Sequence, residues 1–374
     1  MKAVAFLKEH YILLGIMLLG IFLRLYHLEF QSIWLDEIHT MKESDPALSW
    51  KQFHDVITFR EGIPHLYFLL VRLFFELFGY TIWSARFLSV IAGVLGIFGT
   101  YLLGKELFDK KAGLSAAALL AVNTFHIYYS QEARSYALLL MFTVFSFYFL
   151  IRFLKLPTWR MAIFFGLFTG LIAHAHPIGV TAILAAYLVV LFALLKMPTE
   201  HRKNFFLLSS LSGATALVVF YPVYQIISKV SDITSFWVPQ PTPDVYSKLM
   251  LEFLGKSELT LFIFQLLFFY FAFQVFRQRE RTNSWKEVID SRLVLAFLVF
   301  VLWSALSLLI PLIRSYLLVP MIVSRYFINV LPVLLLIAGI AISLIQSKTV
   351  RVTVLASLLT LSAVDIFVVK QYYT

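Results

Sequence analysis

The sequence predicts an all-α polytopic membrane protein, a single transmembrane domain over residues 1–374 with about eleven spanning helices. Of its 374 residues, 60% are hydrophobic and only 14% are charged, and the mean hydropathy is +0.85. Apolar runs of about 20 residues, long enough to cross a hydrocarbon core of roughly 30 Å, recur from end to end. The runs are continuous rather than alternating, which excludes a transmembrane β-barrel.

The first span follows Lys2 and Lys8, a pattern that resembles a signal peptide. It ends without a small-residue cleavage site, so we expect it to stay uncleaved. We expect all the spans at about 10–27, 87–104, 112–129, 134–151, 161–175, 178–195, 205–227, 259–276, 293–313, 326–346 and 351–369.

One further apolar segment, residues 64–80, is ambiguous. If it crossed the membrane, four basic loops would lie outside, against the positive-inside tendency: 104–111, 152–160, 196–203 and 277–292. Arg72 and Glu76, one helical turn apart within the segment, favour an interfacial helix. We therefore predict that residues 64–80 do not span, that the N-terminus is cytoplasmic, and that residues 28–85 and 228–257 form long external loops.

Composition also limits the chemistry. The chain has no cysteine, which excludes disulfides, thiolate catalysis and cysteine-based metal sites. Its net charge of +10 comes from Lys and Arg in short loops between spans, which is the ordinary topology signal. We therefore expect no nucleic-acid partner, and a multi-pass protein of the inner or plasma membrane with its active site on the external face.

Adjacent carboxylates follow the first span in "SIWLDEIHT". An acidic loop that only supports topology or solubility is the simple interpretation of Asp36 and Glu37. The apolar neighbours Ile33, Trp34 and Leu35 would instead seat the pair at the membrane interface, where a carboxylate can act as a base toward a hydroxyl. Adjacent helical residues point about 100° apart, so we expect one of the two to face a substrate and the other to position a partner.

Three arginines are candidates for binding a phosphate. Arg325 begins a late span beside Tyr326, and its guanidinium could hold a phosphate bidentately; the alternative is a contact with lipid headgroups. Arg134 lies in a turn where it could instead pair with Glu132. Arg86 begins the second span and has two further alternatives, pairing with an acid of the first loop or extending to the interface.

His174 and His176 lie between the fifth and sixth expected spans. Two histidines without a third nearby ligand leave three alternatives: metal ligation, hydrogen bonding to a substrate, or packing at the interface. The residues require no metal or other cofactor, although a divalent metal remains an alternative. External acids, external arginines and a helical bundle in lipid together suit transfer of a sugar from a lipid phosphate to a hydroxyl.

The sequence resembles the integral-membrane GT-C glycosyltransferases of the family 39 type, which includes protein O-mannosyltransferases and lipid A aminoarabinose transferases. The resemblance rests on "WLDE", on residues 66–140 and on "SRYFINVLP" near the end. It implies a GT-C fold with interfacial helices in the first external loop, and a polyprenyl-phosphate sugar as donor. It also implies that Asp36 is the catalytic carboxylate with Glu37 beside it, that Arg86 matches the family's arginine at the start of the second span, and that Arg325 is the late arginine near the phosphate.

One motif departs from the family. Many relatives carry "HPP" before the interfacial helix, where this chain has "GIPH", so His65 is displaced and is expected only as a further substrate contact. The sequence therefore predicts an inverting cell-envelope glycosyltransferase. Asp36 and Glu37 form its catalytic site, Arg325, Arg86 and Arg134 bind the donor phosphate, and the expected substrate contacts are His174, His176, His65 and Tyr326.

The acceptor could be a lipid, a glycan or a protein hydroxyl. We expect acceptor recognition by the two long external loops. The main rival hypothesis is a lipid or glycolipid transporter, which would be expected to show internal repeats, and acids or broken helices at mid-membrane. A lipid-binding or assembly scaffold is a third hypothesis. The sequence has no evident repeat and few acids in its spans.

Overall fold

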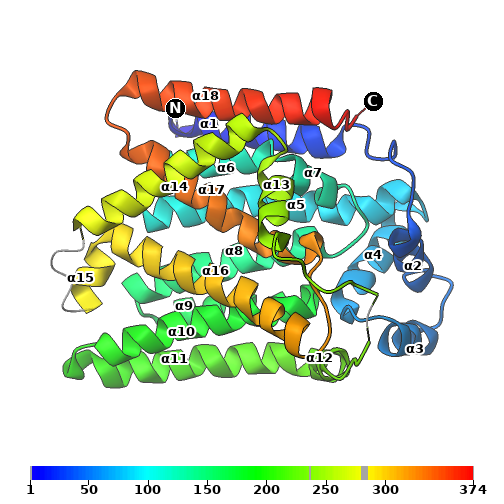
Figure 1. Ribbon diagram of the computed structural model, residues 1–374. Coiled ribbons are helices and arrows are strands. Elements are labelled where there is room, and N and C mark those ends of the chain that lie inside the picture. Colours follow the sequence, from blue (N-terminus) through cyan, green and yellow to red (C-terminus); the bar gives the residue numbers. More distant parts are fainter. Residues whose placement is uncertain (1, 236, 279–284, 374) are drawn as a thin grey trace.

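The computed structural model describes residues 2–235, 237–278 and 285–373, and this part of the chain is built from helices (Figure 1). The first half contains α1 (Lys2–Leu25), α2 (Leu35–Glu43), α3 (Trp50–Arg60), α4 (His65–Phe78), α5 (Ile82–Leu107), α6 (Lys110–Ala121), α7 (Thr124–Ser130), α8 (Tyr136–Lys155), α9 (Trp159–Ala175) and the 3₁₀ turn η1 (Pro177–Gly179). The second half contains α10 (Val180–Lys196), α11 (Thr199–Phe220), η2 (Tyr221–Val223), α12 (Tyr224–Ser231), α13 (Val245–Leu254), α14 (Glu258–Gln278), α15 (Trp285–Asp290), α16 (Arg292–Leu317), η4 (Ser324–Val330), α17 (Leu331–Leu344), α18 (Lys348–Val364) and the π-helical turn η5 (Asp365–Val369).

Eight helical segments in the described part of the chain are long and apolar enough to cross a membrane. They are Ile82–Leu107, Tyr136–Lys155, Pro177–Lys196, Thr199–Val230, Glu258–Gln278, Arg292–Leu317, Ser324–Leu344 and Lys348–Val369. His10–Leu25 and Trp159–Ala175 are shorter apolar helices. The predicted class, an all-α polytopic membrane protein, is confirmed.

The third expected span, 112–129, is divided in two. α6 ends at Ala121, and the side chain of Asn123 accepts a hydrogen bond from the backbone N–H of His126 (2.9 Å), which starts α7. The amide nitrogen of Asn123 also donates to the carbonyl of Phe253 (2.6 Å) in α13. The residue that ends one helix therefore fastens the next to a distant segment.

Close helix packing depends on small residues, as expected inside a membrane. A side chain at Gly104 would place its Cβ 2.8 Å from the Cα of Gly113, where α5 and α6 cross. The same added Cβ would lie 2.9 Å from Leu336 of α17. Glycine at this position therefore lets three helices approach one another.

Helices α2, α3 and α4 lie together at one end of the bundle, on the right in Figure 1, with α15 at the opposite end. Arg72 of α4 holds this group together, because its Nη2 donates to the carbonyls of Pro46 (3.1 Å) and Leu48 (2.9 Å). Its guanidinium also lies over the ring of Trp50 at 4.5 Å. α4 has 14 residues, fewer than a span requires.

Three of the four basic loops come together away from this group. Lys155 Nζ lies 3.3 Å from Glu106 Oε1, which joins the α8–α9 loop to the end of α5. Arg292 donates to the carbonyl of Phe108 (2.6 Å) and brings the start of α16 to the same place. Residues 279–284, within the fourth basic loop, lie outside the described residues. The loops that carry the candidate site residues therefore share the other end of the bundle.

Candidate active site

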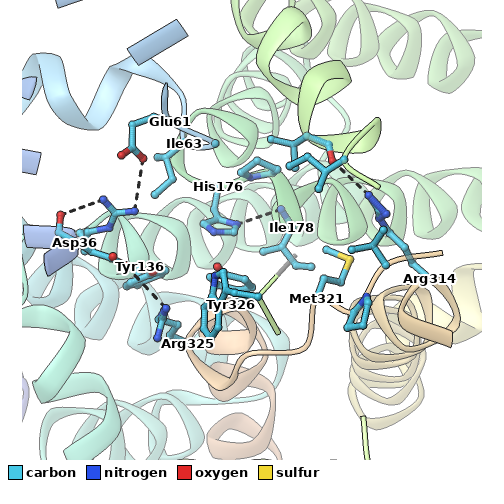
Figure 2. Close-up of a pocket in the computed structure, with 18 of the residues that line it drawn as sticks. Asp36, Glu61, Ile63, Tyr136, His176, Ile178, Arg314, Met321, Arg325 and Tyr326 are labelled. Atoms are coloured by element: carbon cyan, nitrogen blue, oxygen red, sulfur yellow. Dashed lines mark hydrogen bonds and ion pairs between the residues drawn. The ribbon is translucent and has the colours of Figure 1, made fainter. Parts of the chain in front are cut away.

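A cavity of about 630 Å³ opens where α2–α4 meet the bundle (Figure 2). Its walls come from the first loop, from the turns before α8 and α10, from the segment after α12, and from the end of α16 through η4. The lining residues include Trp34, Asp36, Glu61, Arg134, His176, Ile178, Trp237, Arg325 and Tyr326. Residues from six stretches of sequence are thereby brought to one site.

Asp36 and Arg325 face one another across this cavity. Arg325 Nη2 lies 3.9 Å from Asp36 Oδ2, and the Asp36 side chain is 30% exposed. Asp36 owes its position to α2, which begins one residue earlier, whereas Arg325 lies in the short helical turn η4. A carboxylate that could accept a proton and a guanidinium that could hold an anion are therefore neighbours in one accessible site.

Glu37 points away from the cavity into the protein. Arg86 Nε donates to Glu37 Oε1 (2.9 Å) and Arg86 Nη2 to Oε2 (2.8 Å), and both side chains are almost completely buried. The backbone N–H of Ala133 donates to the same carboxylate (2.7 Å), and Arg86 Nη1 donates to the carbonyls of Leu28 (2.8 Å) and Gln31 (3.0 Å). Of the two alternatives for Arg86, pairing with an acid of the first loop is the one found. Neither residue is among those that line the cavity.

Arg134 links the first loop to the bundle. Its Nη1 donates to the carbonyl of Asp36 (3.3 Å) and the hydroxyl of Thr40 (3.2 Å), and its Nη2 lies 3.8 Å from Glu61 Oε2. Burial opposes its charge, but surrounding groups that include Glu61 and Asp36 raise its pKa above the ordinary value. The alternative pairing with Glu132 is absent: within the described chain, neither carboxylate oxygen of Glu132 has a hydrogen-bond partner.

Only one of the three predicted histidine contacts lines the cavity. His176 lies within it, with its ring 4.6 Å from that of Tyr326, and its Nδ1 accepts a hydrogen bond from the backbone N–H of Ile178 (3.2 Å). Burial, together with the charges of Arg134 and Arg325, lowers the pKa of His176 to about 3. His176 is therefore neutral at physiological pH, with Nε2 carrying the remaining proton.

The other two histidines bond to the protein instead. His174 Nε2 donates to the carbonyl of Val219 (2.6 Å). His65 Nε2 lies 3.3 Å from the hydroxyl of Thr58, and burial lowers the pKa of His65. Among the described residues, no group of three or more histidines, aspartates or glutamates is placed to hold a metal ion.

The structure adds residues that sequence reasoning did not select. Glu61 lines the cavity beside Arg134, and it also contacts the buried Glu43, where burial and the charge of Glu61 raise the pKa of Glu43 to about 8. Burial also raises the pKa of Glu132 to about 8. Trp34, part of "WLDE", lies against Arg325, with 5.3 Å from its ring to the guanidinium carbon. Of these residues, the sequence could have indicated only Trp34, because it belongs to "WLDE".

Comparisons with known proteins agree with this architecture. Residues 63–226 match the family described as dolichyl-phosphate-mannose-protein mannosyltransferase. No curated protein matches the chain.

Among solved structures, ArnT from Cupriavidus metallidurans in the apo state is similar, with a TM-score of 0.64 and 16% sequence identity. The match covers 96% of this chain and 63% of ArnT. The same protein bound to undecaprenyl phosphate has a TM-score of 0.64 and 15% identity, over 94% of this chain and 63% of ArnT. The Archaeoglobus fulgidus oligosaccharyltransferase, in complex with Zn and sulfate, has a TM-score of 0.61 and 15% identity, over 95% of this chain and 51% of its own.

This chain therefore spans less than two thirds of the length of either solved relative. At these identities the likeness concerns the fold, while the family match covers residues 63–226. The chain thus has a fold similar to that of ArnT, and residues 63–226 match the family described as dolichyl-phosphate-mannose-protein mannosyltransferase, in agreement with the resemblance found in the sequence.

Proposed function

We propose that this protein is a membrane glycosyltransferase that moves a sugar from a polyprenyl-phosphate donor to a hydroxyl group on the external face, with inversion at the anomeric carbon. The observation that carries the proposal is the pairing of Asp36 with Arg325 across one cavity. The family match and the likeness to an ArnT bound to undecaprenyl phosphate support a donor of this chemical class.

The residues divide the reaction between them. The acceptor oxygen attacks C1 of the sugar while Asp36 takes its proton, and the bond from C1 to the phosphate oxygen breaks. Arg325 neutralises the phosphate that departs, since charge develops there in the transition state. One base acting on a single displacement gives inversion, because the acceptor must approach from the face opposite the leaving group.

Other lining residues surround the sugar. His176, neutral and carrying its proton on Nε2, can donate to a sugar hydroxyl, while Glu61 can accept from one. Arg134 and Tyr326 complete this wall beside the phosphate. Among the predicted site residues outside the cavity, Glu37 and Arg86 act as positioning residues that hold α2 against α5.

The same proposal extends to the topology. Eight long helices, two shorter apolar ones and the divided α6–α7 segment make eleven crossings of the inner or plasma membrane. With the N-terminus in the cytoplasm, loops 28–85 and 228–257 and the cavity lie outside. Both loops contribute to the cavity wall, which supports a role for them in recognising the acceptor.

The test is release of free polyprenyl phosphate from a panel of polyprenyl-phosphate sugars. The purified protein in liposomes would receive crude membrane extract as the source of acceptor. We expect release by the wild type and by Asp55→Asn, an acid of α3 outside the cavity lining, but not by Asp36→Asn.

If no donor is consumed by folded wild-type protein, the transferase hypothesis fails and the rival transporter hypothesis gains. Movement of a fluorescent polyprenyl-phosphate sugar across the bilayer, unaffected by Asp36→Asn, would then establish transport.

A further inference from the structure

Three aromatic rings from three segments surround the guanidinium of Arg325. Its central carbon lies 5.3 Å from the ring centre of Trp34, 5.7 Å from that of Trp237 and 5.6 Å from that of Tyr326. Trp34 comes from the first external loop and Tyr326 is the next residue of the chain. Trp237 belongs to the second long loop and contributes a ring from outside both segments.

The segment that carries Trp237 is fastened on both sides of it. Lys229 donates to the carbonyls of Thr58 (3.1 Å) and Phe59 (2.8 Å), at the end of α3. Beyond Trp237, the hydroxyl of Tyr316 in α16 donates to the carbonyl of Pro241 (3.1 Å). The prolines at 239, 241 and 243 restrict the backbone between these contacts and α13.

The segment is therefore held in place while the tryptophan itself stays accessible. The next residue, Val238, is buried, whereas Trp237 is 65% exposed. An exposed indole in this position adds little to the core, so its removal leaves the fold nearly unchanged. Its contact with Arg325 then becomes the feature that a substitution would disturb.

An arginine at a phosphate site acts through a flat fork of N–H donors, so its orientation matters as much as its charge. Aromatic faces attract a guanidinium and favour a limited set of ring-to-plane arrangements. We propose that Trp237 is a positioning residue for the transfer reaction: with Trp34, it holds the guanidinium of Arg325 so that its donors face the leaving phosphate.

The inference rests on the proposed function and assigns to the second external loop a part in holding the donor. The competing explanation is that Trp237 stacks directly on the sugar or the acceptor. The two differ in one respect: positioning requires Arg325, whereas stacking does not.

The experiment measures affinity for undecaprenyl phosphate in four proteins: wild type, Trp237→Ala, Arg325→Gln and the double variant. We expect Trp237→Ala to weaken binding roughly tenfold in the wild-type background, and to change it less than about twofold when Arg325 is already Gln. Trp237→Phe, which keeps an aromatic face, should recover most of the affinity. An equal loss in both backgrounds, or no loss in the wild-type background, overturns the proposal.

Trp159→Ala is the matched control. Trp159 is 57% exposed and its ring lies 5.3 Å from the guanidinium of Arg160, outside the cavity lining. Removal of this similar contact should leave binding and turnover unchanged. Turnover measured alongside distinguishes failure of the proposed function from failure of the positioning role. If no protein shows turnover, but the loss of binding caused by Trp237→Ala depends on Arg325, the transferase is refuted and the placement of Arg325 by Trp237 stands. Turnover that survives Trp237→Ala without loss of phosphate affinity would do the reverse.

Discussion

Glu37→Gln should destabilise the protein while leaving its chemistry largely in place. In the wild type, the Glu37 carboxylate receives two N–H donors from Arg86 and one from Ala133, in a site almost closed to solvent. The substitution removes the negative charge and turns one acceptor into a donor, which then faces the guanidinium. Arg86 keeps its hydrogen bonds to the carbonyls of Leu28 and Gln31.

The size of the effect follows from these contacts. Breaking a buried ion pair by removal of one partner costs about 3–5 kcal/mol. Because Gln keeps one carbonyl oxygen and Arg86 keeps two backbone acceptors, we expect the lower part of this range, about 3 kcal/mol. Thermal unfolding in detergent, followed by intrinsic fluorescence at one heating rate, should show a midpoint lower by several degrees, on the order of 5 °C.

Two comparisons make this result decisive. The double variant Glu37→Gln/Arg86→Gln should be less destabilised than the sum of the two single variants, because no buried charge is left unpaired. Asp36→Asn should show the opposite behaviour, with a nearly unchanged midpoint and no turnover. A Glu37→Gln protein with wild-type stability but no transferase activity would refute the reasoning and place Glu37 in the reaction.

Three further substitutions test other parts of the structure. Because the pKa of His176 is lowered from 6.5 to about 3, the unfolded chain gains a proton there below about pH 6.5 that the folded protein does not, so stability falls as the pH falls. His176→Gln should abolish about 3 kcal/mol of that loss at pH 4.5, seen in thermal midpoints across a pH series. For Glu43, whose pKa is raised from 4.5 to about 8, the sign is reversed: its stabilising contribution is complete below about pH 4.5 and is lost as the pH rises toward 8. Glu43→Gln should therefore raise the midpoint at pH 7.5 and have little effect at pH 4.5; equal effects at both would contradict the assignment. Gly104→Val should lower the yield of folded protein because α5, α6 and α17 must separate, whereas Gly213→Ala, with open space around its Cβ, should not.

The apolar runs were sufficient to predict the long apolar helices, because a membrane span must pair its backbone N–H and C=O groups within the helix, so its length appears as an apolar run in the sequence. Exceptions arise where a tertiary contact sets a boundary. The break within 112–129 depends on Asn123, whose side chain caps α7 and reaches Phe253. Nothing near Asn123 in the sequence indicates that a segment 130 residues later would lie beside it.

The site was only partly predictable, for a related physical reason. Asp36, Arg134, His176, Arg325 and Tyr326 were selected and do line the cavity. Residue type and position could propose them, because they are polar or charged side chains that the predicted topology brings to the external ends of the spans. Which way a side chain turns depends on its partners, and these lie far along the chain.

The adjacent acids show this most directly. At 3.6 residues per turn, Asp36 and Glu37 of α2 must point about 100° apart, so at most one could face a substrate whichever way the helix turned. The rotation of α2 is fixed by Arg86, which takes Glu37 into the bundle together with the N–H of Ala133. Arg134 then holds the same helix through the Asp36 carbonyl and Thr40. Arg86 comes from α5 and Arg134 from the turn before α8, so the bundle rather than the motif decides that Asp36, and not Glu37, faces the cavity.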